Sequence, residues 1–128
     1  MDKKELVYIC SPLSAPTREG IQKNMNKAAY YTVLVAKEFD CRAIAPHSFL
    51  PEYLDDSIPE EREVALAFGL SVLKIAKAMV VCGKRISSGM NGEIKKAKEW
   101  GIPVYSLLEG EMGNLFVRIE ERKNPNEM

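Results

Sequence analysis

The segment from Ala78 to Trp100 constrains the fold most, because it reads as a strand, a glycine-containing turn and a helix. The run A-M-V-V-C at 78–82 is short and apolar, as expected of a strand buried on both faces. A hydroxyl-rich turn follows, and apolar residues then recur at helical spacing from about Met90. In open parallel sheets, ligands bind beyond the carboxyl ends of strands. The segment therefore predicts an α/β fold and marks a candidate site.

The rest of the chain repeats this alternation. Further strands are predicted at Leu6–Cys10, Ala43–Ala45 and Val104–Leu108, and helices at about Arg18–Phe39 and Pro59–Ile75. We expect a flavodoxin-like, doubly wound parallel sheet in the order 2-1-3-4, with its switch point between the first and third strands. An extra C-terminal element is expected at 112–119, where the apolar spacing favours a helix although an edge strand also fits.

Length and composition fit one domain over residues 1–122, followed by a flexible tail at 123–128. Basic and acidic residues number 18 each, so the charge balance gives no sign of a nucleic-acid partner. No apolar run approaches the roughly 20 residues that span a bilayer. Three cysteines without metal-ligand spacing and a single histidine argue against a zinc site. We expect a cytoplasmic protein that needs no metal and no cofactor and has no membrane partner.

The helix at 59–75 is apolar on two sides. The side predicted to face the sheet comprises Val64, Ala67, Phe68, Val72 and Ile75. The opposite side carries Leu66, Leu70 and Leu73, and the helix at 18–39 adds Tyr30, Tyr31 and Leu34 off its own core face. Helices that are apolar on both sides are usually buried on both. We therefore expect a homo-oligomer, a dimer or larger, that buries one of these helices against its copy.

The turn before the last helix fits two roles. Ser87, Ser88 and Gly89 would present hydroxyl and main-chain N–H groups to an anion at the positive end of the helix. Alternatively, a serine only caps the helix, the glycines only permit the turn, and Glu93 only complements the helix dipole.

Motifs spread over about Val7 to Tyr105 resemble the nucleoside 2-deoxyribosyltransferase-like superfamily, and most closely a small branch of it. The most specific motif is S-x-G-x-x-x-E, which Ser87, Gly89 and Glu93 meet. The other shared features are V-Y-I-C-S-P-L at 7–13, A-P-H at 45–47, L-D-D at 54–56, E-R at 61–62, and Asn24, Ala28 and Tyr31.

The resemblance implies that Glu93 attacks C1′ of a ribose or deoxyribose, releases the base and forms a glycosyl-enzyme ester. It also implies that Tyr8 orients this carboxylate, although the residue equally fits a core position. The expected partner is a nucleoside or a nucleoside 5′-monophosphate, and the acceptor is water or another base. The alternative is a non-catalytic nucleotide-binding or sensing module. A flavin or nicotinamide binder has less support, because no glycine fingerprint follows the first strand.

Four further residues are candidates for the site. Ser11 follows the first strand and could reach a phosphate, and His47 closes the second strand. Asp55 and Asp56 lie in the loop where a lid over the sugar is expected. Asp56 is the candidate second catalytic carboxylate and Asp55 a candidate substrate contact. Alternatively, His47 only makes a structural hydrogen bond, and Asp55 and Asp56 only cap a short helical turn.

One position departs from the superfamily. An aspartate usually enters the third strand and handles the base or the leaving group, whereas this chain has Lys77 there. Either Asp55 or Asp56 supplies the acid, or catalysis is altered or lost. We expect the Lys77 ammonium to point away from the site.

Overall fold

The structure, a computed structural model, describes residues 5–119, and the tail predicted at 123–128 lies outside the described residues. Five strands form one sheet in the order β2-β1-β3-β4-β5. Their bounds are β1 Leu6–Cys10, β2 Arg42–Ile44, β3 Ala78–Val81, β4 Val104–Gly110 and β5 Gly113–Ile119. The first four strands run parallel, and β5 pairs antiparallel with β4. The predicted α/β class and the order 2-1-3-4 are confirmed.

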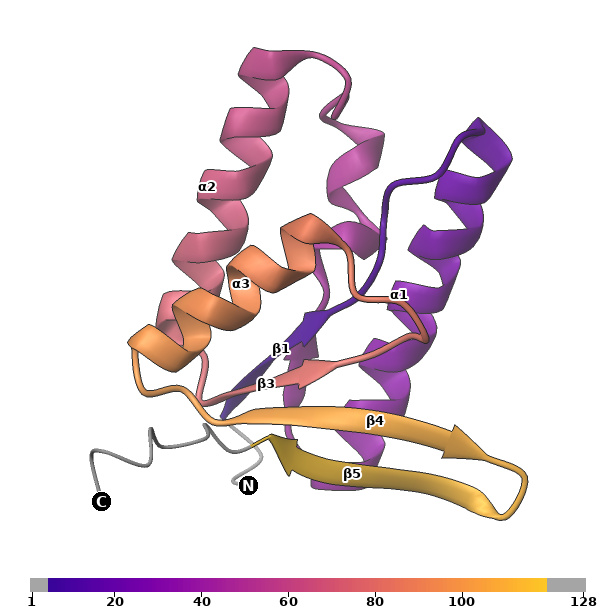
Figure 1. Cartoon of the computed structure of the whole chain (residues 1–128), viewed down its shortest axis with the longest axis vertical. Coiled ribbons are helices and arrows are strands. Elements are labelled where there is room, and N and C mark those ends of the chain that lie inside the picture. The colour runs from indigo at the N-terminus through magenta and orange to yellow at the C-terminus, as the bar shows by residue number, and fades with distance from the viewer. Residues whose placement is uncertain (1–4, 120–128) are drawn as a thin grey trace, which may run out of the picture.

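Three helices flank the sheet: α1 Arg18–Phe39, α2 Pro59–Ile75 and α3 Ser88–Glu99. One face of the sheet carries α1, and the other carries α2 and α3 (Figure 1). Two short 3₁₀ turns, η1 Pro46–Ser48 and η2 Leu50–Glu52, lead from β2 toward α2. They occupy a segment whose apolar residues follow no clear period in the sequence.

Alternate residues of the central strands build two separate cores, as the two-residue period of a strand requires. The core beneath α1 includes Val7, Ile9 and Val80 from the sheet and Ala28, Tyr31 and Val35 from the helix. The core beneath α2 and α3 includes Tyr8, Cys10, Met79 and Val81 from the sheet and Leu73, Met90, Ile94 and Ala97 from the helices. Tyr8 therefore faces the same side of the sheet as α3, which carries Glu93.

The helix favoured for 112–119 is wrong, because this segment is the edge strand β5. Gly110 pairs with Gly113, whose φ of +123° suits glycine, so a tight hairpin turns the chain back along β4. Phe116 packs edge-on against Phe39 of α1, with ring centroids 4.7 Å apart. Met112 and Leu115 are exposed, and the other two members of the spacing that resembled a helical face, Phe116 and Ile119, are only partly buried.

The predicted orientation of α2 is also wrong. Leu73 is 0% exposed and Gly69 is buried, whereas Val64 and Ile75 are 57% and 69% exposed. Gly69 lets the helix approach Tyr8 of β1, and this contact turns the leucine side toward the sheet. On α1, Tyr31 is buried as well. The amino-terminal half of α2 rises past the sheet (Figure 1), so Leu66 borders a cleft instead of the core.

Candidate functional site

A cleft of about 370 Å³ lies at the carboxyl ends of β1 and β2, between α2 and the start of α3. This is the crevice beside the switch point of the sheet, where open α/β folds bind ligands. Its polar lining includes Tyr8, His47, Asp56, Arg62 and Glu93. Leucines of α2 and of the preceding loop supply much of the apolar wall. An apolar cavity with a few convergent polar groups is the usual form of a small-molecule site.

Glu93 is the most confined acid of the cleft. Its Oε2 is covered and has no hydrogen-bond partner in the described part of the chain. Burial raises the pKa of Glu93, while the Tyr8 hydroxyl and the nearby His47 act to lower it. The carboxylate thus has the Tyr8 hydroxyl and the His47 ring as its polar neighbours, and its Oε2 can accept from a further donor.

Tyr8 reaches Glu93 from the centre of the sheet. Burial, and then the charge and the hydrogen bond of Glu93, raise the pKa of Tyr8 far above its usual value. The phenol therefore stays protonated and presents an O–H donor on the side of the Glu93 carboxylate. A Cβ atom at Gly69 would lie 3.1 Å from the Tyr8 hydroxyl oxygen, so the absence of a side chain on α2 leaves room for this group.

His47 lies on the same wall, just beyond β2. Its Nδ1 is 2.8 Å from the main-chain oxygen of Ser11. A carbonyl only accepts, so Nδ1 carries the proton, and Nε2 of the neutral ring is an acceptor. The interaction fixes the ring across the ends of β1 and β2.

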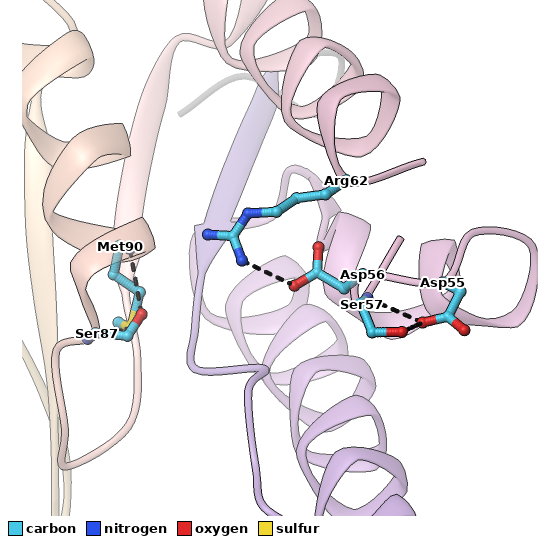
Figure 2. A network of polar contacts seen from close by, with 6 residues as sticks. All are labelled: Asp55, Asp56, Ser57, Arg62, Ser87 and Met90. Carbon is cyan, nitrogen blue, oxygen red and sulfur yellow. Dashed lines mark hydrogen bonds and ion pairs between the residues drawn. The ribbon is translucent and has the colours of Figure 1, made fainter. Parts of the chain in front are cut away.

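The two aspartates of the loop behave differently (Figure 2). The Asp56 carboxylate faces the Arg62 guanidinium at 3.6 Å, and both residues line the cleft. Asp55 instead accepts from the main chain and the hydroxyl of Ser57, at 2.9 and 2.6 Å, and these bonds lower the pKa of Asp55. It lies outside the lining of this cleft and borders a neighbouring groove.

Ser87 caps α3, because its hydroxyl accepts from the main-chain N–H of Met90 at 3.3 Å. Ser88 and Gly89 line the cleft at the positive end of this helix. Arg85 borders the same region and donates to the main-chain oxygen of Ser14 at 3.0 Å. The capping alternative thus describes Ser87, while the two following residues face the cavity.

Ser11 and Lys77 occupy other positions. Ser11 contributes its carbonyl to His47, but its hydroxyl lies outside the cleft lining. Lys77 is exposed, and its N–H donates to the main-chain oxygen of Leu6 at 2.8 Å, at the amino edge of the sheet. An acid at this position would not reach the cleft either, so the departure from the superfamily does not remove a group from this cavity.

Among the cleft residues that sequence reasoning did not assign to the site are Arg62, Gly69 and Lys96. From the sequence, Glu61 and Arg62 are expected in an ion pair on the helix surface or at an interface, whereas the structure pairs Arg62 with Asp56. A glycine inside an otherwise apolar helix was the available signal for a close approach at Gly69. Within residues 5–119, no three His, Cys, Asp or Glu side chains gather as a metal site, and no helix is long and apolar enough to cross a membrane.

The fold is similar to that of a 2-deoxyribosyltransferase from the psychrotolerant bacterium Bacillus psychrosaccharolyticus. The TM-score is 0.59 at 14% sequence identity, over 79% of this chain and 70% of that chain. At such identity the similarity shows the fold alone. No curated protein matches this chain in sequence. A family model matches residues 5–107, which include every residue that lines the cleft. The chain therefore belongs to the family described as a domain of unknown function, DUF7768.

Proposed function

We propose that this protein cleaves or transfers the N-glycosidic bond of a nucleoside or a nucleoside 5′-monophosphate, with Glu93 as the nucleophile. The observation that carries the proposal is the confined Glu93 carboxylate, held by Tyr8 on the wall of a ligand-sized cleft at the switch point. The fold similarity to a 2-deoxyribosyltransferase is consistent with this chemistry.

The reaction follows from the placement of the two carboxyl groups that line the cleft. A Glu93 oxygen bonds to C1′ while the bond from C1′ to the base nitrogen breaks, and the electron pair leaves with the base. Asp56 is the proposed proton donor for the leaving base: it takes a proton from solvent, leaves its pair with Arg62 and passes the proton to the base. Water or a second base then attacks C1′ and releases Glu93. The oxocarbenium character of both steps is stabilised by the adjacent carboxylate.

The remaining groups fit a sugar and its 5′ substituent. Ser88 and Gly89 at the start of α3 are placed to receive a 5′-hydroxyl or a 5′-phosphate. The His47 ring, which the Ser11 carbonyl orients, and the Glu93 oxygen that lacks a donor suit sugar hydroxyl groups. Ser87 supports this turn as the helix cap, and Asp55 supports the loop that carries Asp56.

The test is incubation with a panel of nucleosides and nucleoside monophosphates, followed by chromatography for free base and sugar product. Glu93→Gln should abolish base release while keeping the fold, because the amide cannot form the ester. Lys77→Ala is the matched control and should stay within roughly threefold of the unmodified chain, as expected of a distant surface change. Nucleotide binding without base release by the unmodified chain would favour the sensing module instead.

A further inference from the structure

A second cavity, of about 240 Å³, lies on the α1 side of the sheet. It is open to solvent and bordered by α1, by the segments that follow β1 and β3, and by the end of β4. Its lining comprises Ser11, Pro12, Asn24, Lys27, Tyr31, Gly83, Lys84, Arg85 and Glu109. None of these residues except Arg85 also borders the cleft that holds Glu93. We call this cavity the α1 pocket.

Ser11 lies in the α1 pocket with an unpaired hydroxyl. The residue is 1% exposed, and its Oγ has no hydrogen-bond partner in the described part of the chain. Buried hydroxyl groups are normally paired, so this one calls for a partner from outside the chain. Gly83 closes the pocket beside it. Its φ is +98°, and a Cβ atom there would lie only 2.9 Å from Pro12 Cδ, so no side chain fits at this position.

The charge around this hydroxyl is positive. Lys27 of α1 and Lys84 of the loop after β3 form no ion pair among residues 5–119. Arg85 adds a third cation. The one acid of the lining is Glu109, whose carboxylate accepts from the Tyr31 hydroxyl at 3.4 Å. Three cations against one engaged carboxylate favour an anion.

We propose that the α1 pocket binds inorganic phosphate or the phosphate of a phosphomonoester, as a site separate from the Glu93 cleft. The Lys27 and Lys84 ammonium groups and the Arg85 guanidinium contact phosphate oxygens, and the Ser11 hydroxyl donates to one of them. Because Oγ is covered, the anion reaches this hydroxyl only when the residues around Ser11 shift.

Two residues connect this pocket with the cleft. The carbonyl of Ser11 holds His47 Nδ1, so a shift of Ser11 toward an anion changes the orientation of the imidazole. Arg85 borders both cavities and bonds to Ser14. Phosphate in the α1 pocket therefore alters the position of a cleft residue without entering the cleft.

The test uses the full chain and inorganic phosphate at constant ionic strength, with chloride as the balancing ion. His47 is the only histidine, so its imidazole proton resonances report on the cleft without ambiguity. They should shift saturably as phosphate is added. The double variant Lys27→Ala/Lys84→Ala should weaken this binding by roughly tenfold or more, the loss expected from one or more charge-assisted hydrogen bonds. The matched control Lys37→Ala/Lys95→Ala removes two lysines outside both cavities and should leave the affinity unchanged.

Ser11→Ala separates ligand binding from a structural role. It should weaken phosphate binding while leaving the melting temperature of the phosphate-free protein unchanged or higher, since the hydroxyl has no partner to lose. A lower melting temperature would show that Ser11 serves the fold through a buried water, and would overturn its role here.

Unchanged phosphate affinity in Lys27→Ala/Lys84→Ala, with loss in Lys96→Ala, would place the anion in the cleft. No saturable shift at millimolar phosphate would overturn the proposal outright. None of these readouts depends on turnover, so failure here is distinct from failure of the glycosidic reaction.

Discussion

The hydroxyl of Tyr8, on the central strand β1, faces the carboxylate of Glu93, on α3, and acts to lower the pKa of this acid. The phenol on the floor of the cleft thus partly offsets the effect of burial on Glu93. Since burial is the larger effect, the pKa of Glu93 remains above its ordinary value of 4.5. The ionised form is the nucleophile, so the proposed activity rises with pH as Glu93 loses its proton.

Tyr8→Phe should therefore move the acidic limb of the kcat/KM profile to higher pH. The variant lacks the donor that stabilises the ionised carboxylate, so the pKa of Glu93 rises further. The measurement is base release as a function of pH for both proteins. Tyr53→Phe, an exposed tyrosine outside the cleft, is the matched control and should leave the limb in place. An acidic limb at the same pH in Tyr8→Phe as in the unmodified chain would show that the Tyr8 hydroxyl does not affect the pKa of Glu93.

Glu93→Gln should stabilise the fold at neutral pH while it abolishes turnover. The pKa of Glu93 is higher in the folded than in the unfolded chain, so its contribution to stability is present below the unfolded pKa and is lost as pH rises through the folded pKa. The neutral amide avoids this loss. We expect a gain of roughly 4 °C in Tm near pH 7.5, the size of a typical stabilising change in a domain of this length.

The same comparison under acidic conditions supplies the control for Glu93→Gln. Below about pH 4 both proteins carry a neutral side chain, so the difference in Tm should disappear. A difference that persists unchanged at acid pH would mean that packing, and not the buried charge, separates the two proteins.

Gly69→Ala should lower base release by roughly tenfold, which is the loss expected when about 1.4 kcal/mol of transition-state stabilisation is removed. The stability of the fold should change little. The new Cβ lies 3.1 Å from the Tyr8 hydroxyl oxygen and displaces it from Glu93, while alanine favours the helix by up to about 1 kcal/mol. Gly92→Ala is the control for stability, because a Cβ atom at Gly92 meets nothing within 4 Å. Its change in melting temperature should report the helix preference of alanine alone.

A double variant tests the cause of this loss. In a Tyr8→Phe background the hydroxyl is gone, so Gly69→Ala should cost far less activity than it does in the unmodified chain. Equal losses in both backgrounds would indicate that the methyl group only narrows the cleft.

The sequence was sufficient for the four parallel strands, but not for the edge strand β5 or for every surface that packs on the sheet. Short apolar runs and helical spacing predict β1 to β4 and their order, because buried parallel strands and crossover helices leave strong local patterns. The motif S-x-G-x-x-x-E predicts that Glu93 stands near the ligand end of the sheet. The orientation of α2 did not follow, since both of its sides are apolar and only the long-range contact of Gly69 with Tyr8 selects one. The Asp56 pair with Arg62 and the hairpin at Gly113 likewise depend on contacts or turn geometry that the apolar spacing does not encode.

The reversed orientation of α2 changes the basis of the expected oligomer. Leu73 lies in the core and Leu66 borders the cleft, so the exposed apolar stripe of this helix is Val64, Phe68 and Ile75. We predict that a second copy packs on this stripe through a symmetric contact burying more than about 1,000 Å² in total. Light scattering at tens of micromolar protein should give at least the mass of a dimer.

Two substitutions distinguish this specific contact from non-specific association. Ile75→Glu should reduce the mass to that of a monomer, because it places an unpaired charge within the predicted apolar interface. Val33→Glu alters an equally exposed valine on α1, on the opposite side of the sheet, and should leave the mass unchanged. A monomer mass for the unmodified chain, with or without nucleotide, would contradict the prediction, and each chain would then complete its cleft alone.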